Sequence, residues 1–295
     1  MAKTGYIAIA GRPNVGKSTL MNSMIGQKLS ITAHKPQTTR HAIHGIYTDK
    51  NVQMIFVDTP GLHTQKNTAL NKVLNRSANA SLQDVDVVVM VVEAGQWTDE
   101  DAFAHKIVLQ AARPYMIVVN KIDRLKSKEL LLPYLASLPS GDDLVDVVPI
   151  SAKTGEQLDE LRARLTQQLP EAPFVFSPDQ LTDVSEKFLA SEIVREQLTR
   201  QLDAELPYAL TVEIERFVDE GSLTRINAVI WVERDSQKAI VIGKKGARLK
   251  QVGTLARKSM QHLFDRKVHL ELWVKVKENW VDDARALRHL GYGAD

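Results

Sequence analysis

Eight consecutive residues near the N-terminus have the types and the spacing of a phosphate-binding loop. Residues 11–18 follow the pattern G-x-x-x-x-G-K-[ST], in which glycines let backbone N–H groups converge on phosphate oxygens. A helix that began here would add about half a positive charge at its N-terminus. We expect Lys17 to reach the β- and γ-phosphates and the Ser18 hydroxyl to bind Mg²⁺. The predicted phosphate contacts are Gly11, Arg12, Pro13, Asn14, Val15, Gly16, Lys17 and Ser18.

An acidic residue about forty positions later adds to the chemistry expected at a triphosphate. The apolar run 52–57 ends in Asp58, and an Asp at the end of a strand beside a phosphate loop is placed to hold Mg²⁺, directly or through water. The backbone N–H of Gly61 could approach a γ-phosphate. This second motif adds to the phosphate site the residues Asp58, Thr59, Pro60, Gly61 and Leu62.

A third motif, residues 120–123, indicates which base is bound. The Asp123 carboxylate can accept hydrogen bonds from N1–H and the exocyclic N2 amine of guanine, whereas adenine offers no such pair of donors, so ATP is disfavoured. Lys121 can lay its alkyl stem along the base, and Asn120 can tie this segment to the phosphate loop. A backbone N–H near Ala152 could donate to guanine O6. The predicted guanine contacts are Asn120, Lys121, Ile122, Asp123, Ser151, Ala152 and Lys153.

Strands and helices must bring these motifs to one place. Each motif follows an apolar run typical of a buried strand, and the phosphate loop leads into a helical pattern at 18–25. The expected strands are 6–10, 43–47, 52–57, 86–93, 114–119 and 146–150, and the expected later helices are 99–112 and 157–169. This alternation predicts an α/β fold of the P-loop NTPase type, with a doubly wound, mostly parallel sheet and the ligand at the carboxyl ends of its strands.

Composition limits what else the chain could be. Its 295 residues are too many for one typical core, so two domains are expected. No cysteine is present, which excludes disulfides and thiolate metal sites and fits a reducing, cytoplasmic compartment. The longest strongly apolar run, 87–92, is far too short to span a membrane, although peripheral attachment stays open. The net charge of +2 does not point to nucleic acid, so local clusters must decide.

A linker and a change of pattern separate the two halves. Three prolines within residues 170–178 predict an extended linker. Asp183 is then expected to be the N-cap of a helix that stops before Pro207. Three strands with apolar faces and two further helical stretches follow, in the order helix, strand, strand, helix, G-x-x-G, helix, strand. This order resembles a type II KH domain, a smaller α+β fold.

The second half also carries a basic interval without acids. Residues 238–264 contain seven Lys or Arg and no Asp or Glu, and a G-x-x-G loop with two lysines lies among them. In a KH domain such a loop clamps about four nucleotides of single-stranded nucleic acid. An apolar groove formed by Ile240, Ile242 and Leu249 would take the bases. The predicted RNA contacts are Gly243, Lys244, Lys245, Gly246, Arg248 and Lys250.

The ordered motifs GRPNVGKS, TTR, DTPG, NKID and SAK resemble the Era-like family of translation-factor-type GTPases. The stretches VIGKKG, HLELWVKVK and RALRHLGY extend the resemblance over essentially the full chain. It implies a GTPase domain at 1–170, a linker at 171–184, a type II KH domain at 185–280 and a tail at 281–295. It also implies hydrolysis of GTP to GDP, and binding of 16S rRNA near its 3′ end during maturation of the small (30S) ribosomal subunit.

The same resemblance implies roles for residues around the phosphates. Ser18 and Thr39 would bind Mg²⁺ with Asp58 behind them, although Thr38 could take the place of Thr39. The switch segment that distinguishes GTP from GDP would comprise Gln37, Thr38, Thr39 and Arg40. Some relatives hold K⁺ partly through an Asn like Asn14, in place of an arginine finger.

One position departs from the small signalling GTPases. Those carry Gln directly after D-x-x-G to orient the attacking water, whereas this chain has Leu62, which cannot hydrogen-bond water. We therefore expect slow intrinsic hydrolysis. We expect a monomer that binds GTP, GDP and RNA. A second interpretation makes the chain a nucleotide-dependent docking module whose second domain binds a protein or a membrane surface, such as the cytoplasmic face of the inner membrane.

Overall fold

A computed structural model describes residues 1–33, 35, 38–62, 68–202, 206–290 and 292. The chain forms two compact units. The first comprises Met1–Ser30, Thr39–Asn67 and Asn71–Asp183. The second comprises Ile31–Thr38, Thr68–Leu70 and Val184–Asp295. No helix within the described residues is both long enough and apolar enough to cross a membrane.

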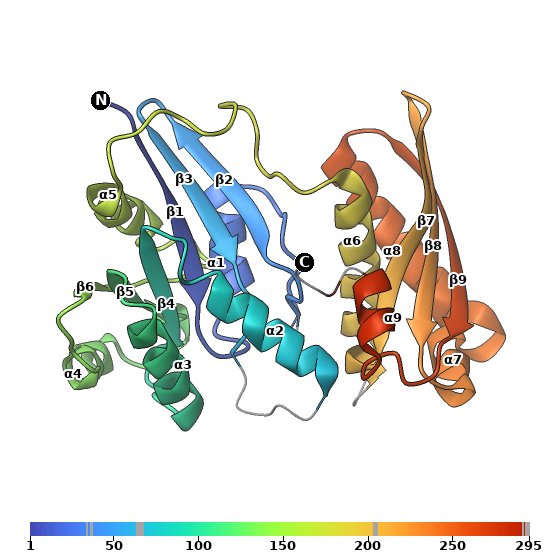
Figure 1. Cartoon of the computed structure of the whole chain (residues 1–295), viewed down its shortest axis with the longest axis horizontal. Helices are drawn as coiled ribbons and strands as arrows, with labels where there is room; N and C mark the ends of the chain where they lie inside the picture. The colour runs from blue at the N-terminus through green and yellow to red at the C-terminus, as the bar shows by residue number, and fades with distance from the viewer. Residues whose placement is uncertain (34, 36–37, 63–67, 203–205, 291, 293–295) are drawn as a thin grey trace. The chain divides into compact units, whose positions relative to one another are not determined.

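The first unit is built on a six-stranded sheet in the order β2-β3-β1-β4-β5-β6 (Figure 1). All neighbouring strands are parallel except β2 and β3, which form an antiparallel pair. The mostly parallel sheet predicted from the sequence is therefore confirmed. The strands are β1 (Lys3–Ala10), β2 (Ile43–Asp49), β3 (Val52–Asp58), β4 (Val87–Glu93), β5 (Tyr115–Asn120) and β6 (Leu144–Pro149).

Helices lie in front of and behind this sheet in Figure 1, as in other doubly wound folds. They are α1 (Lys17–Ile25), α2 (Ala69–Ala80), α3 (Asp99–Gln110), α4 (Leu131–Ser137) and α5 (Leu158–Gln168), with short 3₁₀ turns η1 (Ile122–Arg124) and η2 (Lys128–Leu130). Because both faces are covered, the central strand β4 is buried from Val87 to Val92. The apolar run at 87–92 is thus explained as a core strand.

The second unit has a three-stranded sheet, β7-β8-β9, with β7 antiparallel and β9 parallel to β8. Its elements are α6 (Glu186–Gln201), η3 (Leu206–Tyr208), β7 (Leu210–Asp219), β8 (Leu223–Val232), α7 (Asp235–Ile242), η4 (Lys244–Gly246), α8 (Ala247–Phe264), β9 (Lys267–Val276) and α9 (Ala284–His289). Alternate residues of β8, such as Ile226, Ala228 and Ile230, are fully buried in a core that α6 and α8 share. The predicted element order and KH-type fold are confirmed.

The predicted N-cap of the first helix in this unit was wrong. Helix α6 begins at Glu186, and its N-cap is Ser185, whose side chain accepts a hydrogen bond from the Phe188 N–H at 3.2 Å. Asp183 lies two residues too early and is paired with His44 of β2, with Nδ1 and Oδ2 2.6 Å apart. Both residues are good caps by type, so the sequence alone did not separate them.

Candidate functional site: a guanine-nucleotide pocket and a KH groove

The phosphate loop joins the end of β1 to the start of α1, as its sequence context predicts. Gly16 is the N-cap of α1 with φ 106°, and a Cβ built on it would lie 2.3 Å from Asn120 Nδ2. Gly11 has φ 141°, and a Cβ there would lie 2.4 Å from the carbonyl oxygen of Val91. Both positions therefore need glycine, because any side chain would strain the backbone and collide with the neighbouring strand ends.

Lys17 is buried below this loop. Its Nζ donates to the carbonyl oxygens of Gly11 at 3.0 Å and Arg12 at 2.9 Å. Burial lowers the pKa of Lys17 to about 8; the nearby Asp58 carboxylate opposes this shift, and the Arg12 guanidinium adds to it. The ammonium is still mostly protonated at neutral pH, and it can exchange these loop carbonyls for phosphate oxygens.

The lowered pKa of Lys17 predicts a pH dependence of nucleotide binding. Well below pH 8 the free protein already carries the ammonium, so binding takes up almost no proton there. Above pH 8 the free lysine is mostly neutral, and bound phosphate must restore its proton. We expect GDP affinity to fall with rising pH, with a slope that approaches tenfold per pH unit above pH 8. Calorimetric titrations in buffers of different ionisation enthalpy measure the proton uptake that accompanies GDP binding and should detect it in this range. A flat affinity between pH 7 and 9 would contradict the assignment.

Asp58 offers an oxygen for a metal ion. It is fully buried; its Oδ2 accepts from Ser30 Oγ at 2.7 Å and from Thr39 Oγ1 at 3.2 Å. Among the described residues, no hydrogen-bond partner reaches its Oδ1. Burial raises the pKa of Asp58, and the hydrogen bond from Ser30 and the charge of Lys17 counteract that rise. A buried carboxylate with a free oxygen is a group that a cation would stabilise.

The hydroxyls beside Asp58 fit Mg²⁺, which prefers oxygen ligands. Ser18 Oγ and Thr39 Oγ1 lie 2.9 Å apart, with the Asp58 carboxylate next to Thr39. Thr38, the alternative to Thr39, is instead hydrogen-bonded to the carbonyl oxygen of Lys35 at 2.6 Å. We therefore propose Ser18 and Thr39 as the Mg²⁺ ligands. Mg²⁺ would supply positive charge at the β- and γ-phosphates.

Of the predicted switch residues, Arg40 is buried and Gln37 lies outside the described residues.

The segment after Asp58 packs closely against the phosphate loop. Thr59 Oγ1 donates to the carbonyl oxygen of Ile9 at 2.8 Å, and a Cβ on Gly61 would lie 3.1 Å from Pro13. Leu62 is 1% exposed and belongs to the apolar core of the sheet. Its burial agrees with the expectation that it does not orient a water molecule.

The guanine motif at 120–123 and the S-A-K stretch at 151–153 converge at the ends of β5 and β6. Asn120 Nδ2 donates to the carbonyl oxygen of Val15 at 2.8 Å, which is the tie to the phosphate loop expected from the sequence. Asn120 Oδ1 accepts from the backbone N–H of Ala152 at 3.0 Å. Ser151 Oγ donates to Asp123 Oδ1 at 2.6 Å, so the second carboxylate oxygen can face a base. A contact between Ala152 and guanine O6 would have to share the N–H that Asn120 already accepts.

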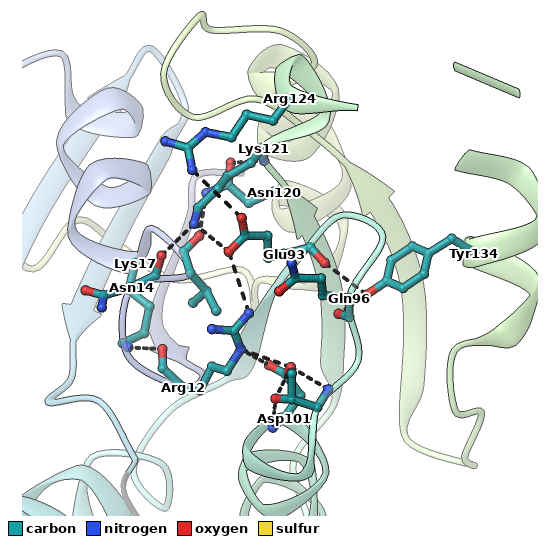
Figure 2. A network of polar contacts seen from close by, with 12 residues as sticks. Arg12, Asn14, Lys17, Glu93, Gln96, Asp101, Asn120, Lys121, Arg124 and Tyr134 are labelled. Atoms are coloured by element: carbon teal, nitrogen blue, oxygen red, sulfur yellow. Dashed lines mark hydrogen bonds and ion pairs between the residues drawn. The ribbon is translucent and has the colours of Figure 1, made fainter. Parts of the chain in front are cut away.

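The Arg12 side chain does not point to the phosphate site. Its Nε donates to both carboxylate oxygens of Asp101, at 3.0 and 3.1 Å, and Lys121 Nζ lies 2.6 Å from Glu93 Oε2 (Figure 2). The prediction of Arg12 as a phosphate contact therefore applies to its backbone only. Neither acid was singled out in the sequence. For Asp101, a signal was present, because Thr98-x-x-Asp101 is a capping-box pattern at the start of α3.

The G-x-x-G loop of the second unit lies at the start of α8. Gly243 has φ 72°, and Lys244 and Lys245 are exposed. Beside the loop is a groove of about 510 Å³ between α8 and β9. It is lined by Gly246, Leu249, Lys250, Gly253, Thr254, Arg257, His269, Leu270 and Leu272.

The structure corrects part of the predicted groove. Leu249 lines it, but Ile240 is 49% exposed outside it, and Ile242 packs against the core. The Arg248 guanidinium donates to the carbonyl oxygen of Ile240 at 2.7 Å, within the protein. Arg257 was missed, although its spacing from Gly246, Lys250 and Gly253 places all four on one helical face.

The fold and both sites define a P-loop GTPase joined to a KH domain. A family model described as "50S ribosome-binding GTPase" matches residues 6–121, and a KH-domain model matches residues 205–281. GTPase Era of Pseudomonas entomophila is 54% identical over 99% of this chain and 97% of its own length. GTPase Era of Xanthomonas axonopodis pv. citri is 53% identical over 98% of this chain and 97% of its own length. The chain belongs to the Era family of GTPases.

Two solved structures have the same fold over the whole chain. One is Era in complex with MgGDPNP and nucleotides 1506–1542 of 16S ribosomal RNA, with a TM-score of 0.95, 36% identity and full coverage of both chains. The other is a variant of Aquifex aeolicus Era bound to GDP and AlF₄⁻, with a TM-score of 0.94, 36% identity and coverage of 99% and 100%.

Proposed function

We propose that this GTPase binds 16S rRNA near its 3′ end through the KH groove and acts in assembly of the small (30S) ribosomal subunit. The observation that carries the proposal is the groove beside Lys244 and Lys245, on a helix whose sequence contains no acid. The related Era structure that contains a 16S rRNA fragment supports the choice of RNA. The bases would lie against Leu249, Leu270 and Leu272, and the lysines would contact phosphates.

We propose further that nucleotide state controls RNA affinity. Thr39 lies beside Ser18 and Asp58, where the γ-phosphate and Mg²⁺ would order it. The described residues just before it, 31–33, 35 and 38, group with the second unit. Within that unit the Thr32 N–H donates to Glu196 Oε1 of α6 at 3.0 Å. Thr38 therefore groups with the second unit and Thr39 with the first, so a change at the phosphates could reach the second unit through the chain itself.

This proposal predicts two different RNA affinities. A 16S 3′-end RNA fragment should bind the GDPNP form and the GDP form with dissociation constants that differ about fivefold or more, the usual size of a coupling between sites. Fluorescence anisotropy with saturating nucleotide and Mg²⁺ measures both values. Equal values would remove the coupling, although RNA binding itself could stand.

We propose Mg²⁺ at Ser18 and Thr39 with Asp58, and K⁺ near Asn14 as a substitute for an arginine finger. We also propose RNA contacts along the G-x-x-G loop and the turn after it, residues 243–250, with domain limits at 1–170 and 185–280. A cytoplasmic location, a monomeric state and a peripheral membrane contact stay predictions. A docking module for protein or membrane is the second candidate, which an exposed Trp273 on β9 favours over a featureless surface.

A further inference from the structure

Glu93 belongs to none of the nucleotide motifs, yet its carboxylate meets two of them. It is the last residue of β4, and its side chain is 19% exposed. Lys121 Nζ donates to Glu93 Oε2 at 2.6 Å and to the backbone carbonyl oxygen of Asn14 at 2.7 Å. One ammonium group therefore joins Glu93, the guanine-site segment and the phosphate loop (Figure 2).

Arg12 approaches the same carboxylate from the phosphate loop. Its Nη2 lies 3.6 Å from Glu93 Oε2, while its Nε is held by Asp101. Asp101 lies in the first turn of α3 and is fully buried. The orientation of its side chain is fixed, because its Oδ2 also accepts from Oγ1 of the N-cap Thr98 at 2.8 Å and from the Thr98 N–H at 3.0 Å. A third cation, Arg124 of η1, is more exposed and lies farther away, with its Nη1 3.9 Å from Glu93 Oε1. Glu93 thus lies among three cations, Arg12 from the phosphate loop and Lys121 and Arg124 from the guanine-site segment (Figure 2).

We propose that Glu93 is a positioning residue that holds Lys121 and the phosphate loop in a fixed relation, so that guanine and phosphates are bound as one unit. The inference rests on the proposed place of Lys121 at the guanine. A carboxylate suits this position because Arg12 and Lys121 would otherwise repel each other. The backbone of Glu93 is held in place, since β4 is paired with β1 on one side and β5 on the other.

The test is a double-mutant cycle on the rate of GDP release. Glu93→Gln keeps the shape but loses the charge-assisted hydrogen bond, and release should become about tenfold faster. In a Lys121→Met background the same change should add less than about twofold, because the two residues act through one contact. Stopped-flow release of a fluorescent GDP gives all four rates. The matched control is Glu100→Gln, an exposed carboxylate in the first turn of α3, which should release GDP at the wild-type rate.

A second variant separates positioning from simple charge balance. Glu93→Asp keeps the negative charge but is one methylene shorter, so it should also release GDP faster. Wild-type release from Glu93→Asp, or additive effects of Glu93→Gln and Lys121→Met, would overturn the proposal. Unchanged release from Lys121→Met alone would instead overturn the guanine-site assignment on which the proposal rests. Circular dichroism and thermal melting confirm that each variant is folded.

Discussion

Replacing Asp123 by asparagine is expected to change the preferred base from guanine to xanthine. The carboxylate of Asp123 is oriented by Ser151 Oγ, which donates to Oδ1 at 2.6 Å, and both carboxylate oxygens keep lone pairs that can face the base. Guanine presents two donors, N1–H and the N2 amine, which an Asn cannot both satisfy. Xanthine has a carbonyl in place of that amine, so the Asn amide N–H and carbonyl restore both hydrogen bonds.

The expected change in nucleotide affinity follows from the free-energy cost of leaving buried polar groups unpaired. A site built to hydrogen-bond its ligand rejects a mismatched analogue by several orders of magnitude, so we expect GDP affinity to fall at least about 10³-fold and XDP affinity to rise. Competition binding with GDP, XDP and ADP measures the change. Asp142→Asn, at an exposed turn, is the matched control and should keep the wild-type preference. Unchanged GDP affinity in Asp123→Asn would show that another group selects the base.

The largest expected effect in the second unit comes from reversing the charge of the G-x-x-G loop. Lys244 and Lys245 are both exposed on the loop that opens α8, beside the groove. The logarithm of the RNA-binding constant falls with the logarithm of salt concentration, and each lost lysine–phosphate contact reduces the steepness of that fall by about 0.7 for a single strand. Loss of two contacts should therefore reduce it by about 1.4. With the added repulsion of two aspartates, we expect the Lys244→Asp, Lys245→Asp protein to bind RNA about 100-fold more weakly at about 0.1 M salt.

Controls make this result specific to the loop. Lys50 and Lys106 are exposed lysines of the first unit, and the same double replacement there should leave RNA affinity close to wild type. GTP turnover without RNA should persist in the loop variant, because the nucleotide site lies in the first unit. RNA affinity that is insensitive to the loop variant would favour the docking module over the RNA clamp.

Sequence reasoning predicted best where a motif is contiguous and its chemistry is local. The phosphate loop, the guanine motif and the order of elements in the KH unit follow from neighbouring residues and from apolar periodicity. The hydrogen bond from Asn120 to the phosphate loop at Val15 could also be predicted, because parallel strands present their carboxyl ends at one edge of a sheet.

What could not be predicted depends on contacts between residues far apart in sequence. Nothing near Glu93 or Asp101 indicates that their partners are Lys121 and Arg12, 28 and 89 residues away. The proposal of Thr39 rather than Thr38 as a Mg²⁺ ligand rests on the position of Asp58 in space, which the sequence did not provide. The groove residue His269 comes from a strand whose packing against α8 the sequence did not specify, whereas the helical spacing of Arg257 was a signal that went unused.

The residues gathered at the carboxyl ends of β1, β3 and β5 are expected to bind guanine nucleotides with Mg²⁺. Calorimetric titration of GDP and of ADP into the purified full chain in Mg²⁺ buffer tests this expectation most directly. We predict one binding site per chain for GDP and no measurable heat with ADP. Absence of heat with GDP, or equal affinity for the two nucleotides, would contradict the account.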